Sequence, residues 1–222
     1  AFLLIPFLLI IAHLQKSDHT VALTPIINLS WLRAPKDSRE RNLRRLWVLD
    51  LLLYFFYFFM VVYTPIYLSV HQGLSWTQIG FIFSFMLLPF LLLEYPLGRL
   101  ADLAWGEKEA LVGGVIILAA STITLYFIDS LEIWPWAAAL FLTRVGAASI
   151  ESMKETYLFK KVAPGDTGIV AIFRNNLPLA YIAGPIVATI FLAFFPLKSI
   201  FLLVGLTMLL GLIPALRLRD TL

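Results

Sequence analysis

The sequence predicts an all-α membrane protein in which six transmembrane helices form a bundle. Two observations lead to this fold class. Of the 222 residues, 60% are hydrophobic and 14% are charged, with a mean hydropathy of +0.88, whereas soluble domains average about 45–50% apolar and about 25% charged residues. The apolar residues also fall into runs of about 20, the length that crosses a bilayer, and short polar turns separate these runs.

The chain divides into four regions by composition. Residues 1–12 form an apolar run that is too short to cross a bilayer, and we interpret it as the end of a truncated transmembrane helix. Residues 13–45 are predicted to be a basic cytoplasmic linker, either a flexible tether or a segment that lies partly on the membrane surface. Residues 46–216 hold the six-span bundle, and residues 217–222 form a short basic tail.

Local signals mark where the spans begin and bend. Asp37 or Ser38 is suited to cap a helix that leads into the first span, and Pro65 is expected to bend that span near its end. Ser75 and Gln78 have the spacing of a capping box at the start of the second span. The predicted spans are 46–70, 76–97, 111–128, 134–157, 168–191 and 198–216.

Small and aromatic residues give expectations about packing and depth. Gly113 and Gly114, near the start of the third span, are expected to be points of close helix contact. Trp134 and Trp136 flank Pro135 at the start of the fourth span, where aromatic side chains are typical of the membrane interface.

The placement of lysine and arginine predicts how the chain is oriented. Short loops that are rich in these residues stay in the cytoplasm. Basic residues occur in segments 13–45, 98–109, 158–167 and 217–222, whereas turns 71–75 and 129–133 hold none. We therefore expect a multi-pass protein of the cell membrane whose C-terminus is cytoplasmic.

The fourth span carries the clearest chemical signal. Arg144 lies about 14 Å past Pro135 along a helix, near mid-bilayer, where a charge costs about 2.5–3.5 kcal/mol and usually faces a cavity or a partner. Glu151 and Glu155 follow on the same helical face, with Lys154 beside them. Such a stripe suits the binding of a charged solute or the passage of a proton. The alternative is a salt-bridge ladder that only fixes helix packing.

The first span carries a second polar face. Asp50, Tyr54 and Tyr57 recur at helical spacing, so they share one side of the helix. They are candidates for the solute pathway. The alternative, which the shallow position of Asp50 favours, is an aspartate near the membrane surface that pairs with Arg44 or Arg45.

The fifth span adds two polar candidates for the pathway, Arg174 and Asn175. We expect Arg174 to pair with Glu151, Glu155 or Asp102, either permanently or as part of a gate.

Residues 94–108 form a short charged turn between the second and third spans. They read Glu94-Tyr-Pro-Leu-Gly98-Arg99-Leu-Ala-Asp102-Leu-Ala-Trp-Gly106-Glu-Lys108. The pattern resembles the loop signature of the major facilitator superfamily, in which Gly-x-Leu-Ala-Asp precedes a glycine and basic residues. The copy is degraded, since Leu103 stands where the family usually has arginine and Gly106 comes one residue late. Ala180, Gly184 and Pro185 resemble a weaker pattern, Gly-x-x-x-Gly-Pro, and are expected helix-packing positions.

The resemblance implies the C-terminal six-helix half of a twelve-helix secondary transporter. The six spans would then be helices seven to twelve, the N-terminal half of the same chain would be missing, and the first and fourth spans would line a central cavity. A small solute, with a proton as a further partner, would cross by alternating access. The charged turn would act as a latch that ties helix ends together, whereas the plain alternative is a turn that only obeys the charge rule for loops.

Other classes of function lack their sequence signatures. There is no cysteine, and His13, His19 and His71 have no second ligand at metal spacing. No phosphate-binding loop, nucleophile turn or basic–aromatic segment for nucleic acid occurs. We therefore expect no enzyme, metal, cofactor or nucleic-acid partner. The alternative to transport is a membrane scaffold or assembly subunit and, less favoured, a membrane-embedded lipid-modifying enzyme.

Overall fold

The structure is a computed structural model that describes residues 35, 37–93, 96, 106–162 and 166–218. Every regular element in this part of the chain is helical, which confirms the predicted fold class. The helices are α2 (Ser38–Val70), α3 (Trp76–Met86), α5 (Glu107–Phe127), α6 (Ile133–Lys161), α7 (Thr167–Arg174), α8 (Asn176–Leu192), η2 (Leu197–Ser199), α9 (Ile200–Leu210) and α10 (Leu212–Leu216).

Six helical segments in the described ranges are long and apolar enough to cross a membrane. They are Ser38–Val70, Trp76–Leu93, Glu107–Phe127, Ile133–Lys161, Gly168–Leu192 and Leu197–Leu216. Each corresponds to one predicted span. The first begins well before residue 46, so the final part of the predicted linker is helical. The predicted truncated helix, 1–12, and most of the linker lie outside the described residues.

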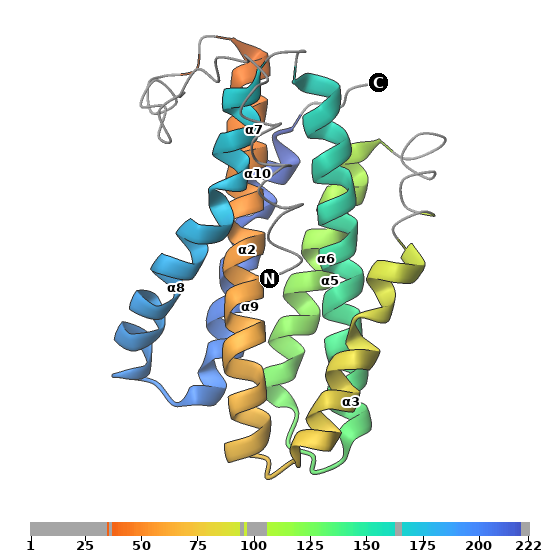
Figure 1. The fold of residues 1–222 in the computed structure, drawn as a ribbon, viewed down its shortest axis with the longest axis vertical. Helices are drawn as coiled ribbons and strands as arrows, with labels where there is room; N and C mark the ends of the chain where they lie inside the picture. The colour runs from red at the N-terminus through yellow and green to blue at the C-terminus, as the bar shows by residue number, and fades with distance from the viewer. Residues whose placement is uncertain (1–34, 36, 94–95, 97–105, 163–165, 219–222) are drawn as a thin grey trace, which may run out of the picture.

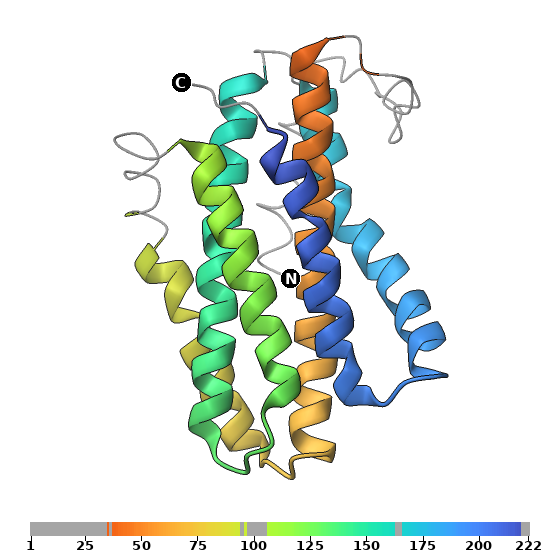
Figure 2. The ribbon, with the colours of Figure 1, turned by 180° about the vertical axis from the view of Figure 1, so that it is seen from behind.

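The spans lie side by side in one bundle. In Figure 1, α2 stands between α8 and α6, and α3 flanks α6 on its far side. Seen from behind in Figure 2, α5 and α9 lie next to each other, and α5 also packs against α6. The arrangement therefore sets α2 and α6 as neighbours between the two flanking helices α3 and α8.

Prolines explain where three of the spans are interrupted. Turn residues occur at Leu87, Asn175 and Gly211, and each precedes a proline by two or three positions: Pro89, Pro178 and Pro214. Because proline has no backbone N–H, the carbonyl four residues earlier loses its helical partner. Pro65 and Pro185 lie inside continuous helices, so neither ends its helix.

Side-chain caps fix two helix starts as the sequence predicts. The Asp37 carboxylate accepts the backbone N–H of Glu40 at 2.7 Å and caps α2. Ser75 and Gln78 form the predicted capping box at the start of α3. Each cap satisfies backbone donors that a helix start otherwise leaves unpaired.

Two glycines bring α5 and α6 into close contact. A Cβ placed on Gly146 would lie 2.5 Å from the backbone nitrogen of Leu118, and 2.7 Å from the carbonyl oxygen of Gly114. Only glycine permits this approach. Gly114 is therefore a packing point as predicted, whereas Gly113 has no atom within 4 Å of its Cβ position, so that part of the prediction is wrong.

An aromatic cluster joins α2, α6 and α9 near the turns that follow α2 and precede α6. The Tyr67 ring lies 5.7 Å from Trp136 and 5.3 Å from Phe201. The Trp136 indole is fully buried and donates to the Ser130 carbonyl at 2.9 Å. Trp134 is exposed, whereas Trp136 belongs to the core, and the place of both at the membrane interface stays a prediction.

Basic side chains gather where α2 begins and α6 ends, at the upper end in Figure 1. Arg39 pairs with Asp166 at 2.6 Å, and Lys160 pairs with Glu107 at 2.7 Å. At the opposite end, Lys198 pairs with Asp129 at 2.5 Å. More basic residues thus lie at the end that the sequence predicts to be cytoplasmic. The orientation itself stays a prediction.

Candidate functional site

The polar face of α2 lies directly against the charged stripe of α6. Asp50, Tyr54 and Tyr57 share one side of α2 by their spacing, and all three contact charged residues of α6. The two faces build one polar layer between apolar helices. The candidate site therefore lies at the α2–α6 contact, closed on one side by α8.

A buried ion pair forms one end of this layer. The ammonium group of Lys154 donates to Asp50 Oδ1 at 2.6 Å, and the two side chains are only 6% and 1% exposed. Asn176, at the start of α8, donates from Nδ2 to Asp50 Oδ2 at 2.7 Å and to the Trp47 carbonyl at 3.1 Å. The Tyr54 ring lies 5.2 Å from the Lys154 nitrogen and adds a cation–π contact. One carboxylate thus joins three helices.

The predicted pairing of Asp50 with Arg44 or Arg45 is wrong. Arg44 pairs with Glu40 one turn earlier, and Arg45 donates to Asn42 and to the Arg217 carbonyl. Asp50 is buried on the inner side of α2, where Lys154 and Asn176 are its partners. Both arginines instead contact residues near the start of α2 and the end of α10.

A hydrogen bond between α2 and α6 forms the next step of the layer. The Tyr57 hydroxyl donates to Glu151 Oε2 at 2.7 Å. Both side chains are partly exposed. The Tyr57 ring also lies 6.1 Å from the Tyr54 ring and 6.5 Å from the Phe90 ring, so these three rings form an aromatic wall beside the hydrogen bond.

Arg144 occupies the other end of the layer, and its surroundings differ from those of Lys154. Its side chain is buried, with 4% of the residue exposed. The guanidinium carbon lies 5.6 Å from the Phe56 ring centre and 5.2 Å from that of Tyr57. No residue in the described ranges accepts a hydrogen bond from the guanidinium, and its Nε is fully enclosed. The cation is thus held by ring faces, with its donors unused.

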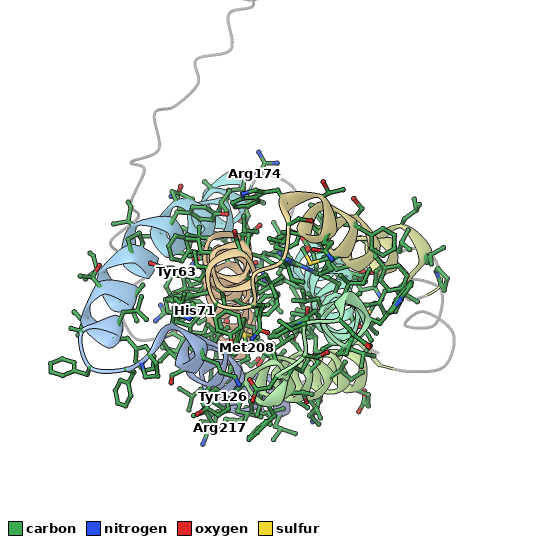
Figure 3. The ribbon with its side chains drawn as sticks, turned by 90° about the horizontal axis from the view of Figure 1, so that it is seen from below. Tyr63, His71, Tyr126, Arg174, Met208 and Arg217 are labelled. Carbon is green, nitrogen blue, oxygen red and sulfur yellow. The ribbon has the colours of Figure 1, made fainter. Side chains whose placement is uncertain are left out.

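The remaining pathway candidates are less enclosed. Glu155 continues the stripe of α6 but is exposed. Arg174 is exposed and points outward from the bundle in Figure 3, and it makes no ion pair with a described residue. The expected pairing of Arg174 with Glu151 or Glu155 is therefore wrong, and Asp102 lies outside the described residues. Asn175 caps the end of α7 at the proline-induced break.

The helix-packing prediction separates into two outcomes. Ala180 and Gly184 are buried, and a Cβ on Gly184 would lie 2.2 Å from the Phe58 ring, so this side of α8 packs closely on α2. Pro185 is exposed and takes no part in that contact.

Most of the predicted gating turn cannot be compared with the structure. Glu94, Gly98, Arg99 and Asp102 lie outside the described residues. Gly106 precedes α5 as its N-cap in extended conformation, and Lys108 lies in the first turn of that helix.

Two residues of the layer were not among the predicted site residues. The sequence places Lys154 only beside the charged stripe, and it predicts Asn175 rather than Asn176 as the pathway residue. No group of three or more histidine, cysteine, aspartate or glutamate residues able to hold a metal occurs in the described part of the chain.

Comparison with protein-family models gives a match to the Major Facilitator Superfamily over residues 2–177 and again over residues 46–221. No curated protein matches the chain. The family match covers most of the chain, and the six spans are the number found in one half of such a transporter. Because the match extends over most of its length, the chain belongs to the Major Facilitator Superfamily.

Proposed function

We propose that the chain is the C-terminal half of a secondary transporter that moves a small solute by alternating access, coupled to a proton. Membership of the family implies membrane transport of solutes rather than enzymatic activity. The proposal also places the protein in the cell membrane with a cytoplasmic C-terminus and assigns a latch to the turn at 94–108.

The observation that carries the proposal is the state of Arg144. A charge at mid-span costs about 2.5–3.5 kcal/mol on insertion scales, and a buried donor left without an acceptor costs about 1–3 kcal/mol. In a helix that only supports the fold, neither the buried charge nor the donor without an acceptor would bring a benefit that offsets its free-energy cost. An arginine that contacts a solute during the transport cycle accounts for them, because the missing acceptor is then supplied by the solute.

Glu151 is the residue that we assign to the proton. It lies on the same face of α6 as Arg144, it is partly exposed, and its carboxylate accepts a hydrogen bond from Tyr57. A carboxylate in this position accepts a proton without breaking an ion pair, since no described cation lies within salt-bridge distance of it. Glu155, more exposed and nearer the helix end, would pass the proton to water.

A scaffold or assembly subunit makes a different prediction for Arg144. It requires the guanidinium to be neutralised by a carboxylate in dry protein. The Lys154–Asp50 pair has this character, whereas Arg144 does not, and this contrast supports transport over the scaffold alternative.

The test uses the full-length protein in liposomes that contain a pH-sensitive dye. We expect a panel of small solutes to include one whose uptake is accompanied by proton entry. Arg144→Gln should abolish uptake while the amount of folded protein is unchanged. Arg41→Gln, an equal loss of charge at the exposed start of α2, is the matched control and should transport normally. If Arg144→Gln lowers only the folded fraction, and that fraction still transports at the normal rate, the arginine is structural and the transport role that we assign to it fails.

A further inference from the structure

Helix α6 carries two buried cations, Lys154 and Arg144, whose partners differ. Lys154 has a carboxylate at 2.6 Å and an aromatic ring. Arg144 has two rings and no acceptor among the described residues. Because α2 supplies a carboxylate and a ring to Lys154 but only rings to Arg144, the missing acceptor of Arg144 is a specific feature of the site.

The nearest carboxylate of α6 does not fill this gap. Glu151 accepts a hydrogen bond from the Tyr57 hydroxyl and forms no salt bridge with Arg144. The Tyr57 side chain thus serves two groups: its hydroxyl holds the carboxylate, and its ring faces the guanidinium at 5.2 Å. The Glu151 carboxylate is thus bonded to Tyr57 and makes no salt bridge with Arg144.

Ring contacts also leave the arginine ready for a planar ligand. The two rings are not hydrogen-bond acceptors of the carboxylate kind, so the N–H donors of the guanidinium keep no described oxygen partner. Those donors lie in the plane of the group as a rigid fork, which matches the two oxygens of a carboxylate.

We propose that Arg144 binds the carboxylate of a small organic monoanion, which is the solute that this protein carries. The inference rests on the proposed transport function and specifies its substrate class. A single negative charge matches the one guanidinium, because Asp50 is already paired with Lys154 and no described carboxylate forms a salt bridge with Arg144. The aromatic wall of Tyr54, Tyr57 and Phe90 suits the uncharged part of such a molecule.

The experiment measures thermal stabilisation of the full-length protein in detergent at constant ionic strength. The probes are matched pairs that differ in charge and little in shape: benzoate with benzamide and lactate with lactamide, together with benzylammonium and inorganic phosphate. We expect at least one carboxylate to raise the melting temperature and its amide, the cation and phosphate to have no effect. The shift should persist in Arg41→Gln. In Arg144→Gln the affinity should fall by at least about 30-fold, the factor for removing one member of a buried charge pair.

Three results would overturn the assignment. They are equal stabilisation by an acid and its amide, undiminished carboxylate binding in Arg144→Gln, and no stabilisation by any carboxylate. Liposome uptake then separates this inference from the proposed function. Uptake of an uncharged or cationic solute that survives Arg144→Gln would contradict the anion assignment and leave transport intact. A carboxylate that binds through Arg144 but never crosses the membrane would contradict transport and leave the binding site intact.

Discussion

Breaking the Lys154–Asp50 pair should destabilise the protein strongly, and breaking both halves at once should not. Lys154→Met leaves a carboxylate that is 1% exposed with Asn176 as its only described donor, and Asp50→Asn leaves a buried ammonium beside the Tyr54 ring. Removing one member of a buried pair costs about 3–5 kcal/mol. At about 2–4 °C per kcal/mol, each single variant should melt roughly 6–20 °C lower.

The double variant carries the sharper expectation. With both charges gone, the amide oxygen at position 50 still accepts from Asn176, and the methionine fills the space of the lysine stem. Neutral replacements of buried pairs are often tolerated, so the double variant should be more stable than either single one. The coupling energy should be about 2–3 kcal/mol.

The assay is equilibrium unfolding of the full-length protein in detergent, followed by tryptophan fluorescence. The chain offers a matched control at the opposite end of the bundle, the Lys198–Asp129 pair, in which the aspartate side chain is 77% exposed. Its cycle of Lys198→Met and Asp129→Asn should give a coupling of only about 0–1 kcal/mol. If the buried pair gives an equally small coupling, or if the losses of its two single variants simply add, the reasoning about burial is refuted.

Three further predictions concern packing, capping and orientation. Gly146→Ala should force α5 and α6 apart and lower the melting temperature by several degrees, whereas Gly113→Ala, which has open space at its Cβ, should not; equal effects would contradict the packing argument. Ser75→Ala removes one half of the capping box and should cost about 1 kcal/mol in an unfolding experiment; no change would mean that the box adds nothing. Because these 222 residues contain no cysteine, Ser130→Cys in an otherwise cysteine-free protein should react with a membrane-impermeant maleimide on intact cells, and Arg217→Cys only after permeabilisation. The reverse pattern would invert the proposed orientation.

Periodicity was sufficient to predict the polar faces but not what they contact. The spacing of Asp50, Tyr54 and Tyr57 places them on one side of α2, and the structure keeps them there. Which neighbour meets that side depends on how the helices are arranged, and this information is absent from the spacing. A charge count gives a partial signal, since Asp50 is the only charged residue of the predicted first span and Lys154 is a cation within the predicted fourth.

The choice between Asn175 and Asn176 was beyond the sequence argument for a local reason. Adjacent residues on a helix differ by about 100° in direction, so one position decides whether a side chain points inward. Pro178 interrupts the helix at Asn175, which shifts the face that α8 presents to α2. Counting from Arg174 across this break therefore cannot identify Asn176 as the buried residue. Burial of Trp136 escaped prediction similarly, because the interface preference of tryptophan does not say which side of α6 faces the bundle.

The two sides of α6 differ in what it would cost to displace the helix. Toward α5, backbone meets backbone at Gly146, and a shift would open a gap that no other contact replaces. Toward α2, the polar layer between the aromatic cluster and the upper end of the bundle consists of the Tyr57–Glu151 hydrogen bond, the ring contacts of Arg144 and one ion pair. Water, a proton or a solute can replace the first two of these without leaving a void, whereas the buried ion pair has no such substitute. A movement of α6 that exposes Arg144 is therefore least costly if it pivots about the Lys154–Asp50 end of the layer and carries α5 along with it.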